Sequence, residues 1–236
     1  MKKSFFFAAL LALLMTACSQ QPRPTENHDT DSIYGQQSGD STRYGLASDG
    51  CNDSVLVLLP YTTHELDTFD IIDAFQEHRI YGRPNIGDDL AVIVNPDSTS
   101  QALMVINLSK LKEQWCYQVT PTWNRQPSDR PVRPIPDSIR QRFMAPREYG
   151  MHLKNGGIVM SSGAYHQQSN EAMSPVKYPP VKRYASWKFF NGRLILIPDT
   201  ASHQDPDTAV IQLLRSDSLE LRFRDHVQSY YRKKSL

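Results

Sequence analysis

The residue types that most often do chemistry in proteins are scattered along this chain of 236 residues. Its seven histidines, at positions 28, 64, 78, 152, 166, 203 and 226, never lie within five residues of one another, and no CxxC, HxH or HExxH motif occurs. Metal ligands usually recur at short, fixed spacings when one segment supplies several of them. The sequence therefore predicts no metal site and no other cofactor.

Nucleophile and acid–base motifs are missing in the same way. The segment Ser161-Ser162-Gly163 lacks the G-x-S-x-G elbow of many hydrolases, and no glycine-rich phosphate loop is present. Carboxylate pairs, such as Asp88 with Asp89, lie in turn-like sequence, where Asp is favoured because its side chain bonds the nearby backbone. We therefore expect a protein that is not an enzyme.

One cysteine is placed for covalent modification. Lys2 and Lys3 precede an apolar stretch of 14 residues, 4–17, which is shorter than the roughly 20 residues of a membrane-spanning helix and indicates a secretory signal over 1–17. The sequence Leu-Met-Thr-Ala before Cys18 resembles the lipobox of bacterial lipoproteins, with Met15 where that pattern favours Leu. The resemblance implies cleavage before Cys18, acyl chains on this residue and anchoring in a membrane through them. The alternative is an ordinary signal peptide.

The residues around Cys18 also bear on location and on the other two cysteines. Ser19 resembles the residues that send lipoproteins to the outer membrane, and the absence of acidic residues directly after it favours the periplasmic face. Because an exported protein meets an oxidising compartment, Cys51 and Cys116 can form a disulfide. The alternative is two separate thiols, and spacing alone does not decide between them.

Charge and composition divide the chain into segments. With 26 Lys and Arg against 25 Asp and Glu, the balance gives no reason to expect nucleic acid as a partner. Residues 18–50 are mostly polar and predict a flexible tether. Hydrophobic patterning then predicts a small antiparallel β domain over 51–107 and a second domain over 108–236.

Short apolar runs and turn residues make the first domain β-rich. The runs at 55–59, 89–95 and 102–108 are bounded by Pro60 and by the Gly and Pro residues of 82–88. In 66–76, apolar residues recur every three positions and permit an amphipathic helix. We predict a bulged strand over 69–74 instead.

The second domain carries three successive hairpin signals. They lie at Asn155-Gly156-Gly157, at Asn191-Gly192 and across 215–218, and the segment "QSYYRKK" at 228–234 can close the set. The Pro- and Arg-rich loop 121–146 leaves room for one short helix near 136–143. The expected fold is therefore all-β, with the second domain an up-and-down meander barrel.

This region resembles the lipocalin-like lipoproteins of gut-type Gram-negative anaerobes over residues 108–232. The resemblance is carried by Leu111 with Trp115, by "LKNGGIVMSSG", by Tyr184 with Trp187, and by "DPDTAVIQLLRSDSLEL". Glu113 stands where the family usually has Gly, and an inserted loop, 165–183, interrupts the meander. The resemblance implies a barrel that binds an apolar molecule, a glycan or another envelope component.

Two groups of side chains are candidates for binding. Trp115, Tyr117 and Trp187 either line a ligand cavity or fill the barrel as core, since an eight-stranded interior is only just wide enough to be filled. The cluster of Arg125, Arg130 and Arg133 either contacts anions or forms a solvated linker. The alternative function is an envelope-stress sensor or scaffold that acts through contacts with an envelope protein.

Overall fold

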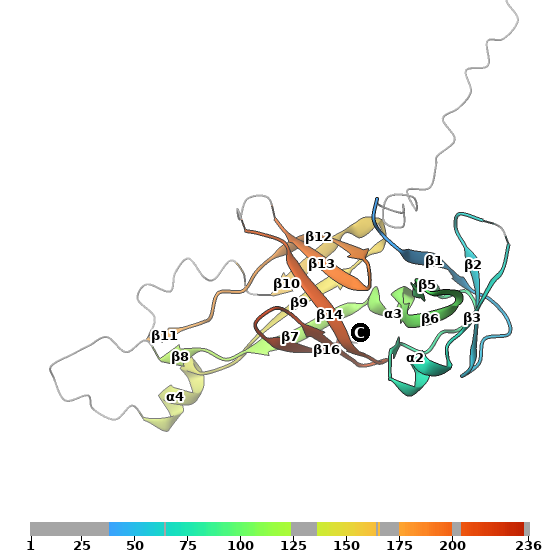
Figure 1. The fold of residues 1–236 in the computed structure, drawn as a ribbon. Coiled ribbons are helices and arrows are strands. Elements are labelled where there is room, and N and C mark those ends of the chain that lie inside the picture. Colours follow the sequence, from blue (N-terminus) through green and yellow to red (C-terminus); the bar gives the residue numbers. More distant parts are fainter. Residues whose placement is uncertain are drawn as a thin grey trace, which may run out of the picture.

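The computed structural model describes residues 38–63, 65–123, 136–163, 165, 175–199 and 204–233. Over these ranges the protein is all-β, with two barrel-like sheets, a two-stranded sheet and three short helices (Figure 1). The expected fold class is confirmed. Among these residues, no helix combines the length and apolar character that crossing a membrane requires.

The first barrel is built from six strands and one helix. In chain order these are β1 (Thr42–Ala47), β2 (Val55–Pro60), β3 (Asp67–Asp70), α2 (Ile72–Gln76), β4 (Ile80–Tyr81), β5 (Asp89–Asn95) and β6 (Ser98–Asn107). The sheet order is β3-β2-β1-β5-β6-β4, and a parallel pair between Asp70 and Gln101 joins β3 to β6. Five strands thus close into a ring with the connectivity of an OB-fold, a five-stranded Greek-key barrel.

The first barrel begins earlier than the sequence predicts. Residues 42–50 were expected in the tether, but β1 lies between β2 and β5 and pairs with both. Tyr44 and Ala47 are buried, and Gly45 allows the Leu59 carbonyl to approach closely. Because pairing on both sides stabilises β1, its low apolar content did not prevent strand formation, and the tether boundary at residue 50 is wrong.

The prediction of a bulged strand over 69–74 is also wrong. Strand β3 ends at Asp70, whose carboxylate accepts a hydrogen bond from the Ile72 amide at 2.9 Å and turns the chain into α2. The Phe75 amide then donates to the Ile71 carbonyl at 2.8 Å. This crossover makes the sheet mixed instead of wholly antiparallel, because β4 runs parallel to β6.

The second barrel is an antiparallel meander whose three hairpins match the sequence prediction. Its strands are β7 (Gln114–Val119), β9 (Arg147–Leu153), β10 (Val159–Gly163), β12 (Tyr184–Phe190), β13 (Arg193–Pro198), β14 (Asp207–Leu214), β15 (Ser218–Arg222) and β16 (Val227–Arg232). Neighbouring strands follow the order β10-β9-β7-β16-β15-β14-β13-β12. A bridge between Ile158 and Ser186, and hydrogen bonds from Ser161 Oγ to the Tyr184 carbonyl and from the Tyr184 amide to Ser161 Oγ, join β10 to β12. The barrel is therefore nearly closed.

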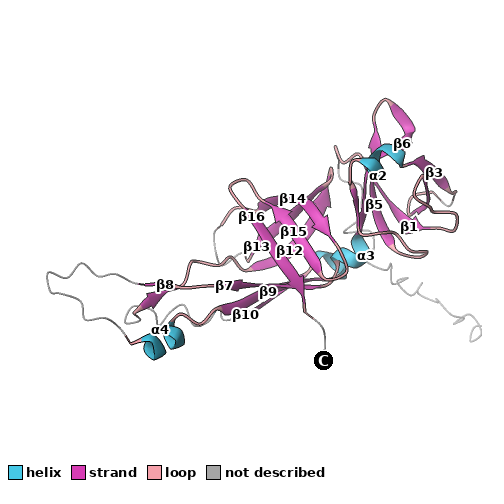
Figure 2. Ribbon diagram, turned by 90° about the horizontal axis from the view of Figure 1, so that it is seen from below, coloured by secondary structure: helices cyan, strands magenta, loops and turns pink. Residues whose placement is uncertain are grey.

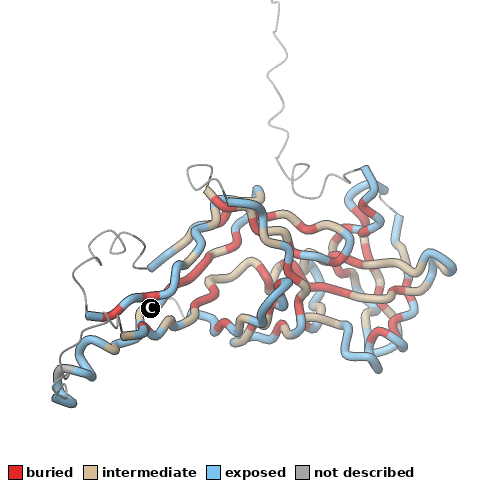
Figure 3. The backbone as a smooth tube through the Cα atoms, turned by 60° about the vertical axis from the view of Figure 1, so that its left-hand side comes forward, coloured by how far each residue is buried: buried red, intermediate tan, exposed pale blue. Residues whose placement is uncertain are grey.

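The first barrel has a hydrophobic core of its own, and a second buried cluster spans both barrels. The helix α3 (Leu108–Leu111) lies between them (Figure 2), and its N-terminus is capped by Asn107, which accepts from the Lys110 amide at 3.0 Å. Tyr44 and Ile106 of the first barrel pack in the same buried cluster as the interior of the second. Buried residues accordingly run along both barrels (Figure 3). The first barrel thus covers one end of the second.

A clasp of hydrogen bonds also fastens the segment before β1 to the second barrel. The Asp40 carboxylate is buried and accepts hydrogen bonds from the Thr42 amide at 3.0 Å, the Tyr44 hydroxyl at 2.8 Å and the Asn191 amide at 3.1 Å. The Asn191 side chain donates in turn to the Gly39 carbonyl at 2.9 Å. Asn191 has φ of 45°, which belongs to the tight β12–β13 turn. This clasp fixes where the chain enters the fold.

An arm extends from the opposite end of the second barrel (Figure 1). It contains the two-stranded sheet of β8 (Thr122–Trp123) with β11 (Val176–Lys177), and α4 (Asp137–Phe143). Tyr178 ties it to the barrel, because its ring lies 3.6 Å below the Arg147 guanidinium and its hydroxyl donates to the Ala145 carbonyl at 2.7 Å. The two loops that interrupt the predicted meander therefore pair with each other.

Candidate functional site

The interior of the second barrel is filled near the first barrel. Trp115 and Trp187 are 0% and 2% exposed there and pack among the leucines of β13, β14 and β15. Each indole N–H is satisfied by a backbone carbonyl at 2.9 Å, that of Leu111 for Trp115 and that of Lys154 for Trp187. Side chains therefore occupy the interior of this half of the barrel.

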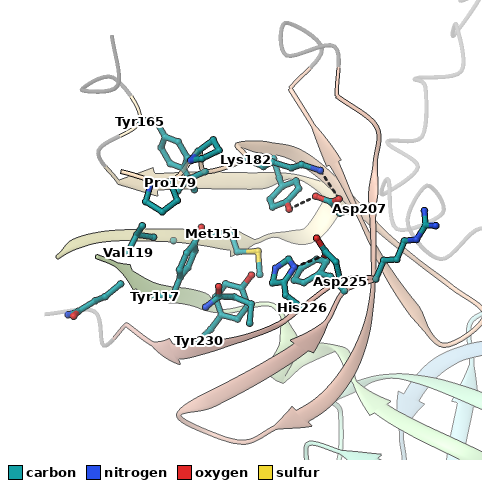
Figure 4. A pocket seen from close by; sticks show the side chains of 18 of the residues that line it. Tyr117, Val119, Met151, Tyr165, Pro179, Lys182, Asp207, Asp225, His226 and Tyr230 are labelled. Carbon is teal, nitrogen blue, oxygen red and sulfur yellow. Dashed lines mark hydrogen bonds and ion pairs between the residues drawn. The ribbon is translucent and has the colours of Figure 1, made fainter. Parts of the chain in front are cut away.

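The other half of the barrel contains a cavity of about 780 Å³ that opens toward the arm (Figure 4). Adjacent strands supply its walls. In β7, Tyr117 and Val119 are two positions apart and therefore point to the same face of the sheet. Met151, in the neighbouring strand β9, faces the same interior. Its apolar and aromatic lining consists of Tyr117, Val119, Met151, Tyr165, Pro179, Pro180, Val181, Tyr184, Phe223 and Tyr230.

One wall of the cavity is a segment outside the sheet, residues 179–182, held by Asp207. The two oxygens of this carboxylate bind different partners: Oδ1 accepts from Lys182 Nζ and Oδ2 from the Tyr184 hydroxyl, both at 2.7 Å. Burial, reinforced by this bond, raises the pKa of Tyr184. Asp207 therefore latches the wall segment to β14.

The remaining charges at the cavity rim are also balanced. The His226 ring stacks on Phe223, with ring centroids 4.9 Å apart, and its Nδ1 lies 2.7 Å from Asp225 Oδ1. The hydrogen bond with His226 lowers the pKa of Asp225. With Lys182 and Arg224 against Asp207 and Asp225, the lining carries two cations and two anions when His226 is neutral.

A cluster of tyrosines forms the deeper wall. The Tyr117 ring meets Tyr230 edge-on at 5.2 Å between centroids and lies 6.2 Å from Tyr149, which in turn meets Tyr165 edge-on at 5.1 Å. Burial raises the pKa of Tyr117, Tyr165 and Tyr230. These three phenols therefore stay protonated at neutral pH and present O–H donors.

Searches against known protein families, curated protein sequences and solved structures found no match. The site must therefore be interpreted from its own geometry. Within the part of the chain that the structure describes, no three His, Cys, Asp or Glu residues are close enough together to hold a metal ion.

The structure separates the three predicted ligand-lining residues. Tyr117 lies on the cavity wall, whereas Trp115 and Trp187 are core side chains and do not reach the cavity. Of the two alternatives for the tryptophans, the structure contains the core, because both pack toward the end that the first barrel covers. Cys18 and the arginines Arg125, Arg130 and Arg133 lie outside the described residues.

The two remaining cysteines belong to different barrels, and both thiols are free. Cys51 precedes β2, where its Sγ donates to the Ser48 carbonyl at 3.2 Å and accepts from the Val57 amide at 3.3 Å. Cys116 is fully buried in β7, and this burial raises the pKa of its thiol. Of the two alternatives, the structure contains the separate thiols and not the disulfide.

Sequence reasoning missed the other residues of the cavity. No sequence motif marks Asp207, and Tyr165 belongs to the inserted loop. Tyr230 and Met151 carry a usable signal, because both occupy inward positions of strands that flank β7. A second hollow, of about 580 Å³, lies between the two barrels and includes Cys51 and Phe75 in its lining.

Proposed function

We propose that this protein is a non-enzymatic, lipid-anchored envelope protein whose C-terminal barrel binds a small, mostly apolar molecule. The observation that carries the proposal is the contrast between the two halves of the barrel: one is filled by Trp115 and Trp187, and the other leaves a cavity of about 780 Å³. Ligand cavities typically measure about 300–1,000 Å³ and combine apolar walls with a few polar groups.

The anchoring half of the proposal is supported by the sequence around Cys18, which resembles a lipobox. Acyl chains on Cys18 would attach the protein to the outer membrane, with the barrels on its periplasmic side. The fold takes in the chain from Gly39 onward, so residues 39–50, which the sequence predicts as part of the tether, belong to the folded part. The lipocalin-like resemblance of residues 108–232 supports the binding half.

The binding proposal is tested with an uncharged fluorescent dye, N-phenyl-1-naphthylamine. The protein is the chain from residue 18 with Cys18→Ser, which cannot be acylated and leaves the described fold whole. Val119→Trp places a bulky ring in the cavity, whereas Val227→Trp adds the same ring at a strand position that is 51% exposed and outside it. We expect wild type and Val227→Trp to bind the dye alike, and Val119→Trp to bind at least tenfold more weakly.

A second cavity-filling variant keeps the test valid if Val119→Trp does not fold. Val181→Trp lies on the wall segment outside the sheet and leaves the strand pairing intact. Circular dichroism and thermal unfolding first establish that each variant is folded. If folded Val119→Trp and Val181→Trp bind the dye as tightly as wild type, the cavity is not the binding site and the proposal fails.

The arm supports a second candidate, a scaffold or sensor that binds an envelope protein. Its helix α4 projects beyond the barrel and exposes Phe143 together with the charged residues Arg140 and Arg142. Crosslinking in intact cells separates the two functions. A protein partner that is captured reproducibly through residues of α4, and lost when Phe143 is changed to Ser, favours the scaffold. If no such partner is captured, binding of a small molecule in the barrel remains the better explanation.

A further inference from the structure

The tyrosine cluster of the cavity has hydroxyl donors that no described residue accepts. Over the described ranges, Tyr117 and Tyr230 line the cavity without a side-chain hydrogen bond to another residue. Just behind them, the Tyr149 hydroxyl is fully buried and lacks a hydrogen-bond partner in the same part of the structure. Buried polar groups are nearly always satisfied, so we expect these hydroxyls to donate to an acceptor outside the described residues.

The contrast with Tyr184 shows that the unused donors are specific to one wall. The Tyr184 hydroxyl donates to Asp207 at 2.7 Å, so it is fully occupied by the latch. Tyr117 and Tyr230 meet edge to face, and the angle of 80° between their rings forms a corner with aromatic sides. A flat ring system fits such a corner because aromatic rings pack well in offset and edge-on arrangements.

The charges of the cavity argue against an ionised ligand. Lys182 is paired with Asp207 at 2.7 Å, Asp225 lies beside His226 at the rim, and Arg224 is exposed to solvent. Burying a charge without a partner of opposite sign is strongly unfavourable, and the tyrosine wall offers neutral donors only. An uncharged ligand avoids this penalty.

We infer that the cavity holds an uncharged molecule with a flat ring body and at least one carbonyl or ether oxygen, which accepts hydrogen bonds from Tyr117 and Tyr230. This inference rests on the proposed function and names the chemistry of its ligand. The ring body packs against the aromatic corner, and the oxygen meets the two phenols that have no acceptor within the described chain.

Three compounds that share one bicyclic skeleton test the inference: tetralin, which has no oxygen, 1-tetralone, which adds a carbonyl, and 1,2,3,4-tetrahydro-1-naphthoate, which adds a carboxylate. Their dissociation constants are measured by displacement of N-phenyl-1-naphthylamine from wild type and from the double variant Tyr117→Phe/Tyr230→Phe. Each hydrogen bond to a neutral group is worth about 2- to 12-fold in affinity. We expect the double variant to lose about tenfold in affinity for 1-tetralone and less than twofold for tetralin.

Tyr231→Phe is the matched control, because Tyr231 neighbours Tyr230, points to the other face of β16 and donates its hydroxyl to Glu148 at 2.6 Å. It should leave both affinities unchanged. Equal losses for tetralin and 1-tetralone, or tightest binding of the carboxylate, would overturn the inference while leaving the cavity as a binding site. If none of the three compounds displaces the dye, the inference fails, whereas dye binding that persists undiminished in folded Val119→Trp and Val181→Trp defeats the proposed function itself.

Discussion

The clasp around Asp40 gives the sharpest prediction for stability. Its carboxylate is 6% exposed and accepts three hydrogen bonds, of which two come from backbone amides and one from the Tyr44 hydroxyl. Asp40→Ala removes both carboxylate oxygens and with them all three of these hydrogen bonds. Tyr44 retains a second acceptor, the Phe189 carbonyl at 3.1 Å, but the amides of Thr42 and Asn191 lose their bonds to the carboxylate.

The size of the destabilisation follows from the two backbone amides, of Thr42 and Asn191, that lose their acceptor in Asp40→Ala. A hydrogen bond to a charged group contributes about 1.5–3 kcal/mol, and the loss of Asp40 also removes the connection between the entering chain and the β12–β13 turn. We expect Asp40→Ala to lower the free energy of unfolding by about 3 kcal/mol. In a protein of this size each kcal/mol corresponds to about 2–4 °C, so Tm should fall by roughly 6–12 °C.

Urea unfolding followed by tryptophan fluorescence measures this difference. Asp40→Asn keeps one side-chain oxygen as an acceptor and should cost about 1 kcal/mol, while Asp97→Ala, at an exposed turn position, should have almost no effect. A value for Asp40→Ala within about 0.5 kcal/mol of wild type would refute the reasoning. The hydrogen bonds of the clasp would then contribute almost nothing to the free energy of unfolding.

Three further predictions follow from other contacts. Asp207→Ala releases the latch on Lys182, so trypsin should cleave after residue 182 several-fold faster than in wild type; unchanged cleavage would show that another contact holds the wall. The hydrogen bond from Lys233 lowers the pKa of Glu148, so this group contributes stability above the pKa of an unfolded Glu, about 4.3, and loses it as the pH falls through the lower folded value. Wild type should therefore lose stability in acid more steeply than Glu148→Gln in pH-dependent urea titrations, and parallel curves would contradict this. Gly45→Ala drives a methyl group into the β2 backbone and should cost about 1–3 kcal/mol in the same assay, whereas a neutral result would mean that β1 can shift.

The sequence was most informative where backbone chemistry is local. The β12–β13 hairpin was predictable from two letters, because Asn191 and Gly192 take φ of 45° and 75°, and few other residues adopt this conformation readily. Strand β1 was not predictable in the same way. It is stabilised by pairing with β2 and β5, which flank it in space. The mostly polar sequence around β1 does not indicate these partners.

The candidate site shows the same limit more clearly. Trp115, Tyr117 and Val119 alternate along β7 and all face the barrel interior, and this alternation is visible in the sequence. Which of them borders a cavity depends on how many side chains enter from the other strands at each level. Side chains of the first barrel and of α3 pack in the same buried cluster as Trp115. The sequence of β7 alone does not reveal this packing.

The central claim is that the second barrel carries a small molecule, and native mass spectrometry of the protein isolated from the cells that make it tests this most directly. The account predicts a noncovalent mass excess on wild type that disappears on denaturation and is absent from folded Val119→Trp, with Val227→Trp retaining it. A wild-type mass that contains only the polypeptide and its covalent acyl groups, or an excess that Val119→Trp keeps, would contradict the claim.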